Sequence, residues 1–172
     1  DWLLDDLRAC DRDWIIAIMH QGAYSKGSHS SDVDIDLIRT RNHVIPLLEN
    51  YGADLVLCGH SHCYERSGFT DGHYGFSTTW NPATMRPWPG NGSEVGGVNP
   101  AGDFIQSPAM AGGAYQKPAT LPRTGAVYVV AGGSSSIQAW YGGSAAYVNP
   151  NPHPAHVVSL LELGSLIVEV DG

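Results

Sequence analysis

The sequence predicts an α/β fold, because strand, helix and strand patterns follow one another in the first third of the chain. The continuous apolar run at 13–19 has the length and pattern of a strand that is covered on both faces. A segment with helical spacing follows at 32–51, and a second apolar strand follows at 54–58. By default, a strand, helix and strand in this order form a right-handed crossover between two parallel strands.

The composition is that of one acidic globular domain. The chain has 172 residues, 42% of them hydrophobic, and a formal net charge of −8 with only 9 Lys and Arg. This charge balance argues against a nucleic-acid-binding surface and against an anionic membrane as partner. No apolar run reaches the roughly 20 residues that span a bilayer. Three cysteines without a Cys-x-x-Cys pair exclude a disulfide scaffold.

The helix at 32–51 has recognisable start, kink and stop signals. Ser31 is a suitable N-cap, since its hydroxyl can accept a hydrogen bond from a free amide of the first turn. Pro46 lies inside the helical pattern and predicts a kink or a break. Gly52 fits the position after the last turn, where a left-handed backbone ends the helix.

The other elements follow from the same patterns. The sequence predicts a helix at 1–10 and further strands at 126–132, 156–163 and 165–170. The last two strands would form a hairpin across Gly164. Between 68 and 124, Gly, Pro, Asn, Ser and Trp dominate, which predicts a long irregular segment of the kind that is usually functional or partly disordered.

Histidines stand directly after two of the predicted strands. His20 follows the strand at 13–19, whereas His60 and His62 follow the strand at 54–58 after Gly59. The carboxyl ends of parallel strands lie at one edge of the sheet, where open α/β sheets place their sites. Neutral imidazole is a common ligand of Zn, Fe and Mn, so the three histidines predict a metal site. In a His-x-His pair the two rings diverge, and they would address two adjacent metal ions.

A plainer interpretation stands beside this one. A single histidine at a strand end is more often a surface or capping residue than a ligand. A two-metal centre also requires bridging carboxylates that hold the ions roughly 3.5–4 Å apart. No Asp or Glu follows either strand, and Asp32, Asp34 and Asp36 are interpreted as acids of a helix start. The carboxylates are therefore expected from elsewhere, and His73, His153 and His156 are interpreted as structural.

The stretch GHSHCYER at 59–66 resembles the G-H-x-H motif of the calcineurin-like metallophosphoesterases. Its Tyr-Glu-Arg ending is similar to the purple acid phosphatase branch of that superfamily. The stretch MHQGAYSKGSH at 19–29 is similar to the preceding histidine motif of the branch, although Gly22 and Ala23 stand where a proline is frequent. DGHYGFSTTWNPATM and GAVYVVAGGSSS are similar to bacterial members.

The resemblance implies a four-layer α/β fold, an α+β sandwich of two β-sheets flanked by helices. Residues 1–172 would form the carboxyl-terminal portion of a single catalytic domain, with an irregular insertion at about 68–124. The Gly-Asp, Gly-Asp-x-x-Tyr and Gly-Asn-His motifs of the family do not occur in this sequence. We therefore expect the chain to be cut after them, and to lack the amino-terminal half of the domain with its bridging carboxylates.

The resemblance also implies a dinuclear centre of Fe with Zn, Mn or a second Fe. His20 and His60 match ligands of the second metal, and His62 matches a ligand of the first, usually iron. His29 matches a non-ligand histidine that contacts the phosphate or protonates the leaving group. The remaining ligands would come from the missing amino-terminal part.

The implied activity is acid-phosphatase-like hydrolysis of phosphomonoesters, in which a metal-bound hydroxide attacks phosphorus. The partner would be a small-molecule phosphate ester. Two alternatives stay open, namely a phosphodiesterase or nucleotidase of the same superfamily, and a non-catalytic binding module that keeps the fold. The 172-residue chain alone is expected to be inactive. Secretion or a periplasmic location is expected because the family is mostly exported.

Overall fold

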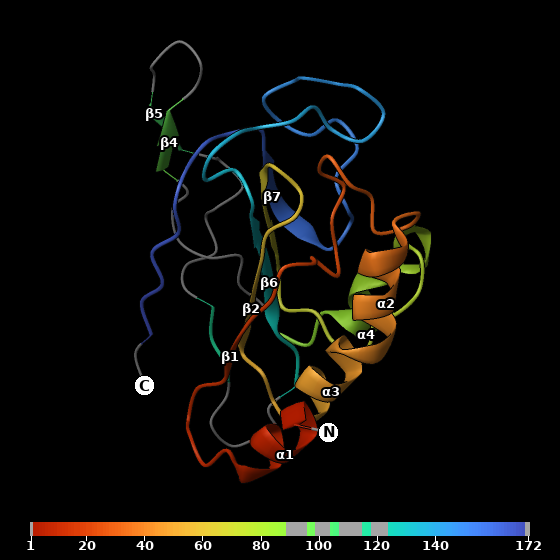
Figure 1. Ribbon diagram of the computed structural model, residues 1–172, viewed down its shortest axis with the longest axis vertical. Helices are drawn as coiled ribbons and strands as arrows, with labels where there is room; N and C mark the ends of the chain where they lie inside the picture. The colour runs from red at the N-terminus through yellow and green to blue at the C-terminus, as the bar shows by residue number, and fades with distance from the viewer. Residues whose placement is uncertain (1, 89–95, 99–103, 107–114, 118–123, 171–172) are drawn as a thin grey trace.

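The computed structural model describes residues 2–88, 96–98, 104–106, 115–117 and 124–170. It is a mixed α/β structure built on a five-stranded sheet of order β1-β2-β6-β3-β7 (Figure 1). The strands of this sheet are β1 (Ile16–Ile18), β2 (Leu55–Cys58), β3 (Tyr64–Ser67), β6 (Val127–Ala131) and β7 (His156–Leu160). The helices are α1 (Trp2–Ala9), α2 (Ile35–His43), α3 (Ile45–Asn50) and α4 (Pro82–Met85), with a 3₁₀ turn at Ser77–Thr79. β4 (Gly96–Val98) and β5 (Phe104–Gln106) pair as a separate antiparallel hairpin.

The parallel crossover predicted from the sequence is confirmed. β1 pairs with β2 and β2 pairs with β6, both in parallel. The carboxyl ends of these three strands therefore lie at one edge of the sheet. β3 runs antiparallel between β6 and β7 and begins at that same edge. The chain that joins β2 to β3 must consequently pass over the end of β6.

The predicted helix at 32–51 is divided into α2 and α3. Pro46 lies in the first turn of α3, where a residue without an N–H is tolerated. Gly52 follows with φ 79°, so the predicted left-handed stop is confirmed. The helix begins three residues later than the proposed cap Ser31, because the carboxylate of Asp34 accepts the hydrogen bond from Asp36 N instead.

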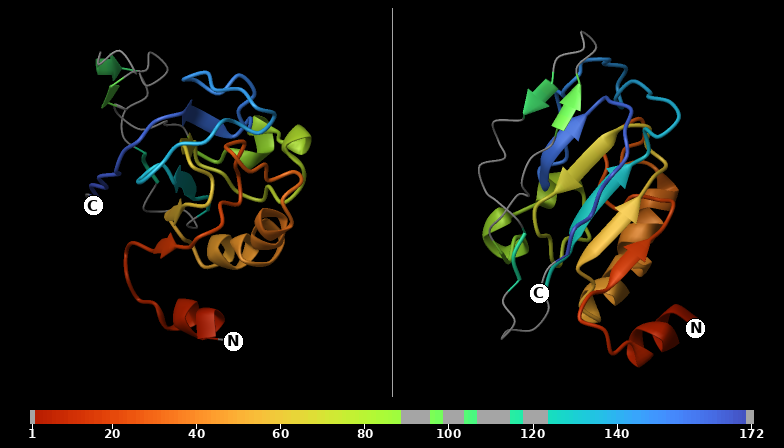
Figure 2. Two further views of the ribbon diagram at one scale, coloured as in Figure 1. Left: turned by 45° about the horizontal axis from the view of Figure 1, so that its top comes forward. Right: turned by 90° about the vertical axis from the view of Figure 1, so that its left-hand side faces the viewer.

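Both faces of the central strands are packed. Side chains of β2 and β6 alternate between a cluster that contains Val56 and Tyr128 and one that contains Leu55 and Val127. Figure 1 and Figure 2 show α2 and α3 one after the other on one face of the sheet. The first cluster lies on that face and includes residues of α3, whereas the second is covered by aromatic side chains of irregular segments and by Leu166.

Two strand predictions were wrong. β1 is an edge strand rather than a strand covered on both faces, and Ile18 is 79% exposed. Residues 161–170 contain no strand, so the predicted hairpin across Gly164 does not form. β7 instead pairs with β3, a strand of sequence Tyr-Glu-Arg-Ser that hydrophobic periodicity does not reveal.

The expected irregular segment at about 68–124 lies partly outside the described residues. Its described parts hold the 3₁₀ turn, α4 and the β4–β5 hairpin. Thr70 forms an isolated bridge to Ala126, which ties this segment to the start of β6. None of the described helices is long and apolar enough to cross a membrane.

Candidate metal centre

The histidines that follow β1 and β2 meet at the carboxyl edge of the sheet. The Nε2 atom of His20 lies 3.2 Å from the Nδ1 atom of His60. The two rings are nearly perpendicular, with centroids 5.1 Å apart. Gly59 N donates a hydrogen bond to the carbonyl of His20, so the two strand ends remain paired up to the histidines.

The backbone turns sharply at His60. Its φ is 66°, in the left-handed region that residues other than glycine rarely adopt. Such conformations cost of order 1–3 kcal/mol and cluster at functional sites. The turn carries the chain over the end of β6, where Gly132 contacts it. A Cβ atom on Gly132 would lie 2.0 Å from the carbonyl oxygen of Ser61, so this crossing requires a glycine.

His29 and Asp34 complete the group. The Nδ1 atom of His29 lies 2.8 Å from Oδ2 of Asp34, and the Nε2 atom of His60 lies 3.4 Å from the same oxygen. The rings of His29 and His60 are tilted with centroids 4.0 Å apart. Partial burial raises the pKa of Asp34, but hydrogen bonds from His29, Asp36 N and His60 together lower it by a larger amount. The net pKa therefore lies below its ordinary value.

The interpretation of Asp34 as a helix-start acid alone was too narrow. Asp34 does cap α2 through Oδ1, as a helix-start acid should, but its second oxygen faces two histidines. The loop from β1 to α2 places this carboxylate at the carboxyl edge although it follows no strand. A search of the sequence for residues that follow strands does not find Asp34 as a neighbour of His29 and His60.

His62 takes different partners from the other histidines. Its Nδ1 atom lies 2.9 Å from the hydroxyl of Ser136, and its amide donates to Ser28 Oγ. Among the interactions of the described residues, none joins the ring of His62 to the rings of His20, His29 or His60. The two imidazoles of the His-x-His pair are therefore engaged in different directions.

The donor set fits a divalent transition metal. Two nitrogens bound to one tetrahedral ion at about 2.0–2.1 Å lie about 3.3 Å apart, and His20 Nε2 and His60 Nδ1 are 3.2 Å apart. The other ring nitrogen of His60 faces Asp34, an arrangement that orients metal-bound imidazoles in many proteins. His29, Asp34 and His60 also offer one ligand atom each, all within 4.8 Å of one another.

Comparisons with known proteins agree with this geometry. The family described as "Calcineurin-like phosphoesterase" matches residues 1–64. Purple acid phosphatase 23 of Arabidopsis thaliana is 38% identical over 69 residues, which cover 38% of this chain and 14% of that protein. The structure of purple acid phosphatase PPD1 from yellow lupin (Lupinus luteus) seeds matches with a TM-score of 0.50 and 17% identity. This chain is therefore similar to the calcineurin-like phosphoesterases over residues 1–64 and, within that superfamily, to purple acid phosphatases.

The proteins that this chain matches are much longer than the part that it covers. The lupin match covers 95% of this chain and 22% of the lupin chain, and its low identity shows a shared fold. An uncharacterized protein of Mycobacterium tuberculosis is 37% identical over 81 residues, which cover 45% of this chain and 15% of that protein. The described chain therefore has a metallophosphoesterase fold and spans about one seventh of the length of these curated relatives.

Several polar residues near the histidines of this sheet edge were not found from the sequence. Ser136 belongs to a Gly-Gly-Ser-Ser-Ser stretch that reads as a simple turn, yet it contacts His62. Glu65 reads as half of a Glu–Arg pair, but the two side chains leave β3 in opposite directions. Glu65 is fully buried against residues 25–26, whereas Arg66 lies over the ring of Tyr115 at 5.8 Å.

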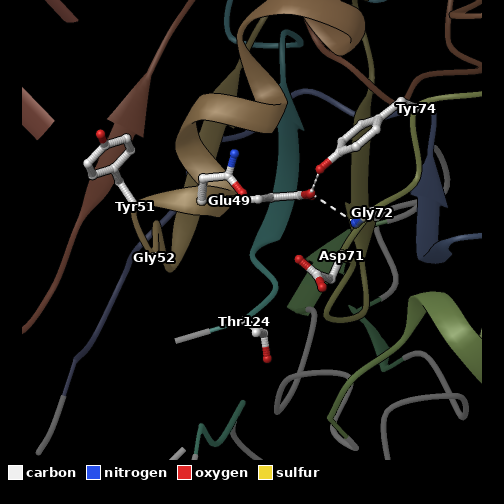
Figure 3. A pocket seen from close by; sticks show the side chains of 8 residues that line it. Glu49, Tyr51, Gly52, Asp71, Gly72, Tyr74 and Thr124 are labelled. Carbon is white, nitrogen blue, oxygen red and sulfur yellow. Dashed lines mark hydrogen bonds between the residues drawn. The ribbon is translucent and has the colours of Figure 1, made fainter. Parts of the chain in front are cut away.

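A hollow of about 590 Å³ lies at the opposite, amino-terminal edge of the sheet. Its lining includes Glu49, Gly52, Asp71, Tyr74 and Thr124. Figure 3 shows the Glu49 carboxylate directed at the hydroxyl of Tyr74 and the amide of Gly72, with Asp71 beside them. Burial raises the pKa of Glu49 despite its hydrogen bonds to tyrosine hydroxyls. The hollow contains none of the site histidines and plays no part in the metal centre.

Proposed function

We propose that this chain carries the histidine part of a dinuclear metal centre that hydrolyses phosphate esters, with phosphomonoesters as the substrate class. The observation that carries the proposal is the meeting of His20 Nε2 and His60 Nδ1 at 3.2 Å, with Asp34 directly behind His60. The match of residues 1–64 to the calcineurin-like phosphoesterase family supports the reaction type.

Each histidine has a proposed role. His20 and His60 would hold the second metal ion, while Asp34 orients the ring of His60 from the far side. His62 would bind the first metal ion through Nε2, since Ser136 engages its Nδ1 atom. The metals proposed are Fe for the first position and Zn, Mn or Fe for the second. Bound metal ions would lower the pKa of a bound water and neutralise phosphate oxygens.

His29 is the proposed catalytic histidine. Its Nδ1 atom faces the Asp34 carboxylate at 2.8 Å, which leaves Nε2 available to hold or deliver a proton. A carboxylate in that position fixes the orientation of the imidazole ring. The ring is half-buried and tilted against the ring of His60, with centroids 4.0 Å apart, so His29 lies next to the proposed metal site.

Two alternatives of activity class are distinguished by substrate. A phosphodiesterase or nucleotidase would use the same centre, whereas a non-catalytic module would bind metal or a partner without turnover. Relative rates on 4-nitrophenyl phosphate and on bis(4-nitrophenyl) phosphate separate a phosphomonoesterase from a phosphodiesterase. Turnover of neither compound would favour the non-catalytic module. This assay uses a polypeptide that joins this chain to the Gly-Asp and Gly-Asn-His motifs, because this sequence lacks them and we expect the chain alone to be inactive. The proposal includes export from the cytoplasm, as secreted or periplasmic protein.

The first test is metal binding to the 172-residue chain. We expect Zn²⁺ to bind in calorimetric titration, and elemental mass spectrometry to give a metal content that His60→Ala abolishes. Asp34→Asn should weaken Zn²⁺ binding roughly 10- to 100-fold, as loss of an orienting carboxylate usually does. Asp36→Asn is the matched control, since this exposed residue lies two positions further along the chain and pairs with Arg39. Unchanged metal content in His60→Ala, or none in the native chain, would contradict the proposal.

A further inference from the structure

Glu65 is a fully buried carboxylate that the proposed reaction does not use directly. It lies in β3, five residues after His60, with 0% of its surface exposed. Its Oε2 atom accepts a hydrogen bond from Ser25 Oγ at 2.6 Å, and its Oε1 atom accepts one from Lys26 N at 2.9 Å. A buried charge of this kind is costly unless its partners are strong donors.

The nearby histidine does not neutralise this charge. His156 Nδ1 lies 3.6 Å from Glu65, but His156 Nε2 faces the carbonyl of Tyr24 at 3.2 Å. A carbonyl only accepts, so the neutral ring carries its proton on Nε2. His156 Nδ1 then accepts from Ser159 Oγ at 3.1 Å and offers Glu65 no hydrogen. The charge of Glu65 is therefore balanced by Ser25 and Lys26 of the loop that holds His29, together with the thiol of Cys63.

Those donors continue as a directed chain towards the metal site. Ser25 has one hydroxyl hydrogen, and the short contact to Glu65 uses it. Ser61 Oγ, 2.7 Å from Ser25 Oγ, must then donate to Ser25. Ser61 Oγ can in turn accept from the amide of His29 at 3.3 Å. The hydrogens point one way, from His29 N through Ser61 and Ser25 to Glu65.

The chain ties together the two segments that carry the site. Ser25 and His29 belong to the loop after β1, while Ser61 lies between His60 and His62. Gly27 permits the close contact, because a Cβ there would lie 2.5 Å from Cys63 Sγ and 2.7 Å from Ser61 Cβ. We propose that Glu65 is a positioning residue, whose charge orders the Ser25 and Ser61 hydroxyls and so fixes His29 relative to His60. The positioning of His29 by Glu65 is argued from the contacts alone, and only its effect on catalysis rests on the proposed function.

Replacement by glutamine distinguishes positioning from simple core packing. Glu65→Gln keeps the shape of the side chain, but its NH₂ group is a donor and must face either Ser25 or Lys26 N. Against Ser25 it reverses the chain, so that the Ser25 hydroxyl donates towards Ser61 or the carbonyl of His29. Against Lys26 N it sets two donors face to face. A residue that only fills space would tolerate the same change without effect on His29.

The experiment compares Glu65→Gln with Glu169→Gln, the same change at an exposed carboxylate. Backbone ¹H–¹⁵N spectra and imidazole ¹⁵N shifts are recorded without metal, together with urea unfolding. We expect the His29 and Ser61 amide signals and the His29 and His60 ring signals to move or split in Glu65→Gln, and to stay in place in Glu169→Gln. Zn²⁺ affinity should fall roughly 10- to 100-fold in Glu65→Gln alone.

Shifts confined to Lys26 and His156 in a folded Glu65→Gln protein would overturn the proposal. If Glu65→Gln fails to fold, Ser61→Ala takes its place, since it cuts the chain beyond Ser25 and leaves Ser25 and Lys26 N as donors to Glu65. Unaltered His29 signals in Ser61→Ala would overturn it equally. The spectra need no metal, so a native chain that binds no Zn²⁺ contradicts the proposed function and leaves this test intact.

Discussion

Two groups of histidines in this molecule have opposite surroundings. His20, His29 and His60 lie at the carboxyl edge of the sheet, partly open to solvent, and two of them face the Asp34 carboxylate. His73 and His153 are fully buried, with ring centroids 5.4 Å apart and each within about 5.5 Å of the Tyr24 ring. Among the described residues, neither ring nitrogen of His73 has a hydrogen-bond partner.

Burial explains what separates the groups. It lowers the pKa of His73 to about 4, and the positive charge of Arg41 acts in the same direction. Burial also lowers the pKa of His153 well below its ordinary value, with contributions from His156 and His73. These rings are held neutral as packing groups, whereas the strand-end rings keep solvent access and a carboxylate. Exposure and, for His29 and His60, a neighbouring carboxylate therefore distinguish the histidines of the proposed site from the packing histidines.

The largest expected effect comes from comparing a double substitution in the strand-end group with a double substitution in the buried group. His20→Gln with His60→Gln removes two proposed ligands, and at about 3 kcal/mol per ligand this should weaken Zn²⁺ binding roughly 10⁴-fold. His73→Gln with His153→Gln should lower the free energy of unfolding and leave Zn²⁺ affinity unchanged. Calorimetric titration and urea unfolding measure both. Loss of Zn²⁺ binding in the folded buried-pair variant would show that the distinction is wrong.

Acid should destabilise the protein through the buried group. The folded-state pKa of His73 is about 4 and the ordinary value is 6.5, so between these pH values only the unfolded chain takes up the proton. The contribution of His73 to the free energy of unfolding is complete above pH 6.5 and is lost as the pH falls to 4. The loss amounts to about 3 kcal/mol.

The difference between native protein and His73→Phe isolates this contribution. Glu49 has a raised pKa and acts with the opposite sign, since the folded state then holds its proton more tightly as the pH falls. Urea unfolding at pH 7.5 and 4.5 should show a smaller loss of stability in His73→Phe than in the native protein. Equal losses in the two proteins would contradict the assignment.

A third change sharpens the role of the crossing at the strand edge. Gly132→Ala would place a Cβ 2.0 Å from the backbone oxygen of Ser61, so the His60–His62 turn must shift. We expect about 2 kcal/mol of destabilisation, typical of overpacking, and weaker Zn²⁺ binding. Gly164→Ala is the control, because nothing lies within 4 Å of its Cβ position. If both variants unfold at the same urea concentration, the close contact between residue 132 and the backbone of Ser61 does not constrain the turn.

The smallest effect is expected at Ser136. Ser136→Ala removes the hydroxyl 2.9 Å from His62 Nδ1, and an exposed neutral hydrogen bond contributes about 1 kcal/mol or less. The ring of His62 should change its ¹⁵N shifts while those of His20 and His60 stay unchanged. Ser135→Ala is the neighbouring exposed control. Shifts at His60 as large as those at His62 would show that the two rings are coupled.

Much of the frame was predictable from the sequence. The apolar runs, Pro46 and Gly52 indicated the parallel crossover and the division of the helix, and the structure has both. The edge position of β1 was not predictable, because an apolar run does not reveal which strands lie beside it. β3 was missed because its Glu65 and Arg66 are charged, and their burial depends on partners far away in the chain.

The site shows the same division. Local signals placed His20, His60 and His62 directly after strands, because hydrophobic runs and a glycine are properties of short stretches. The meeting of Asp34 with His60, and the chain from Glu65 to His29, join residues 26 and 36 positions apart. Folding alone brings such groups together, since hydrogen bonds and charge pairing depend on distances in space. The sequence determined which residue types follow the strands, whereas the folded sheet edge determined which side chains contact them.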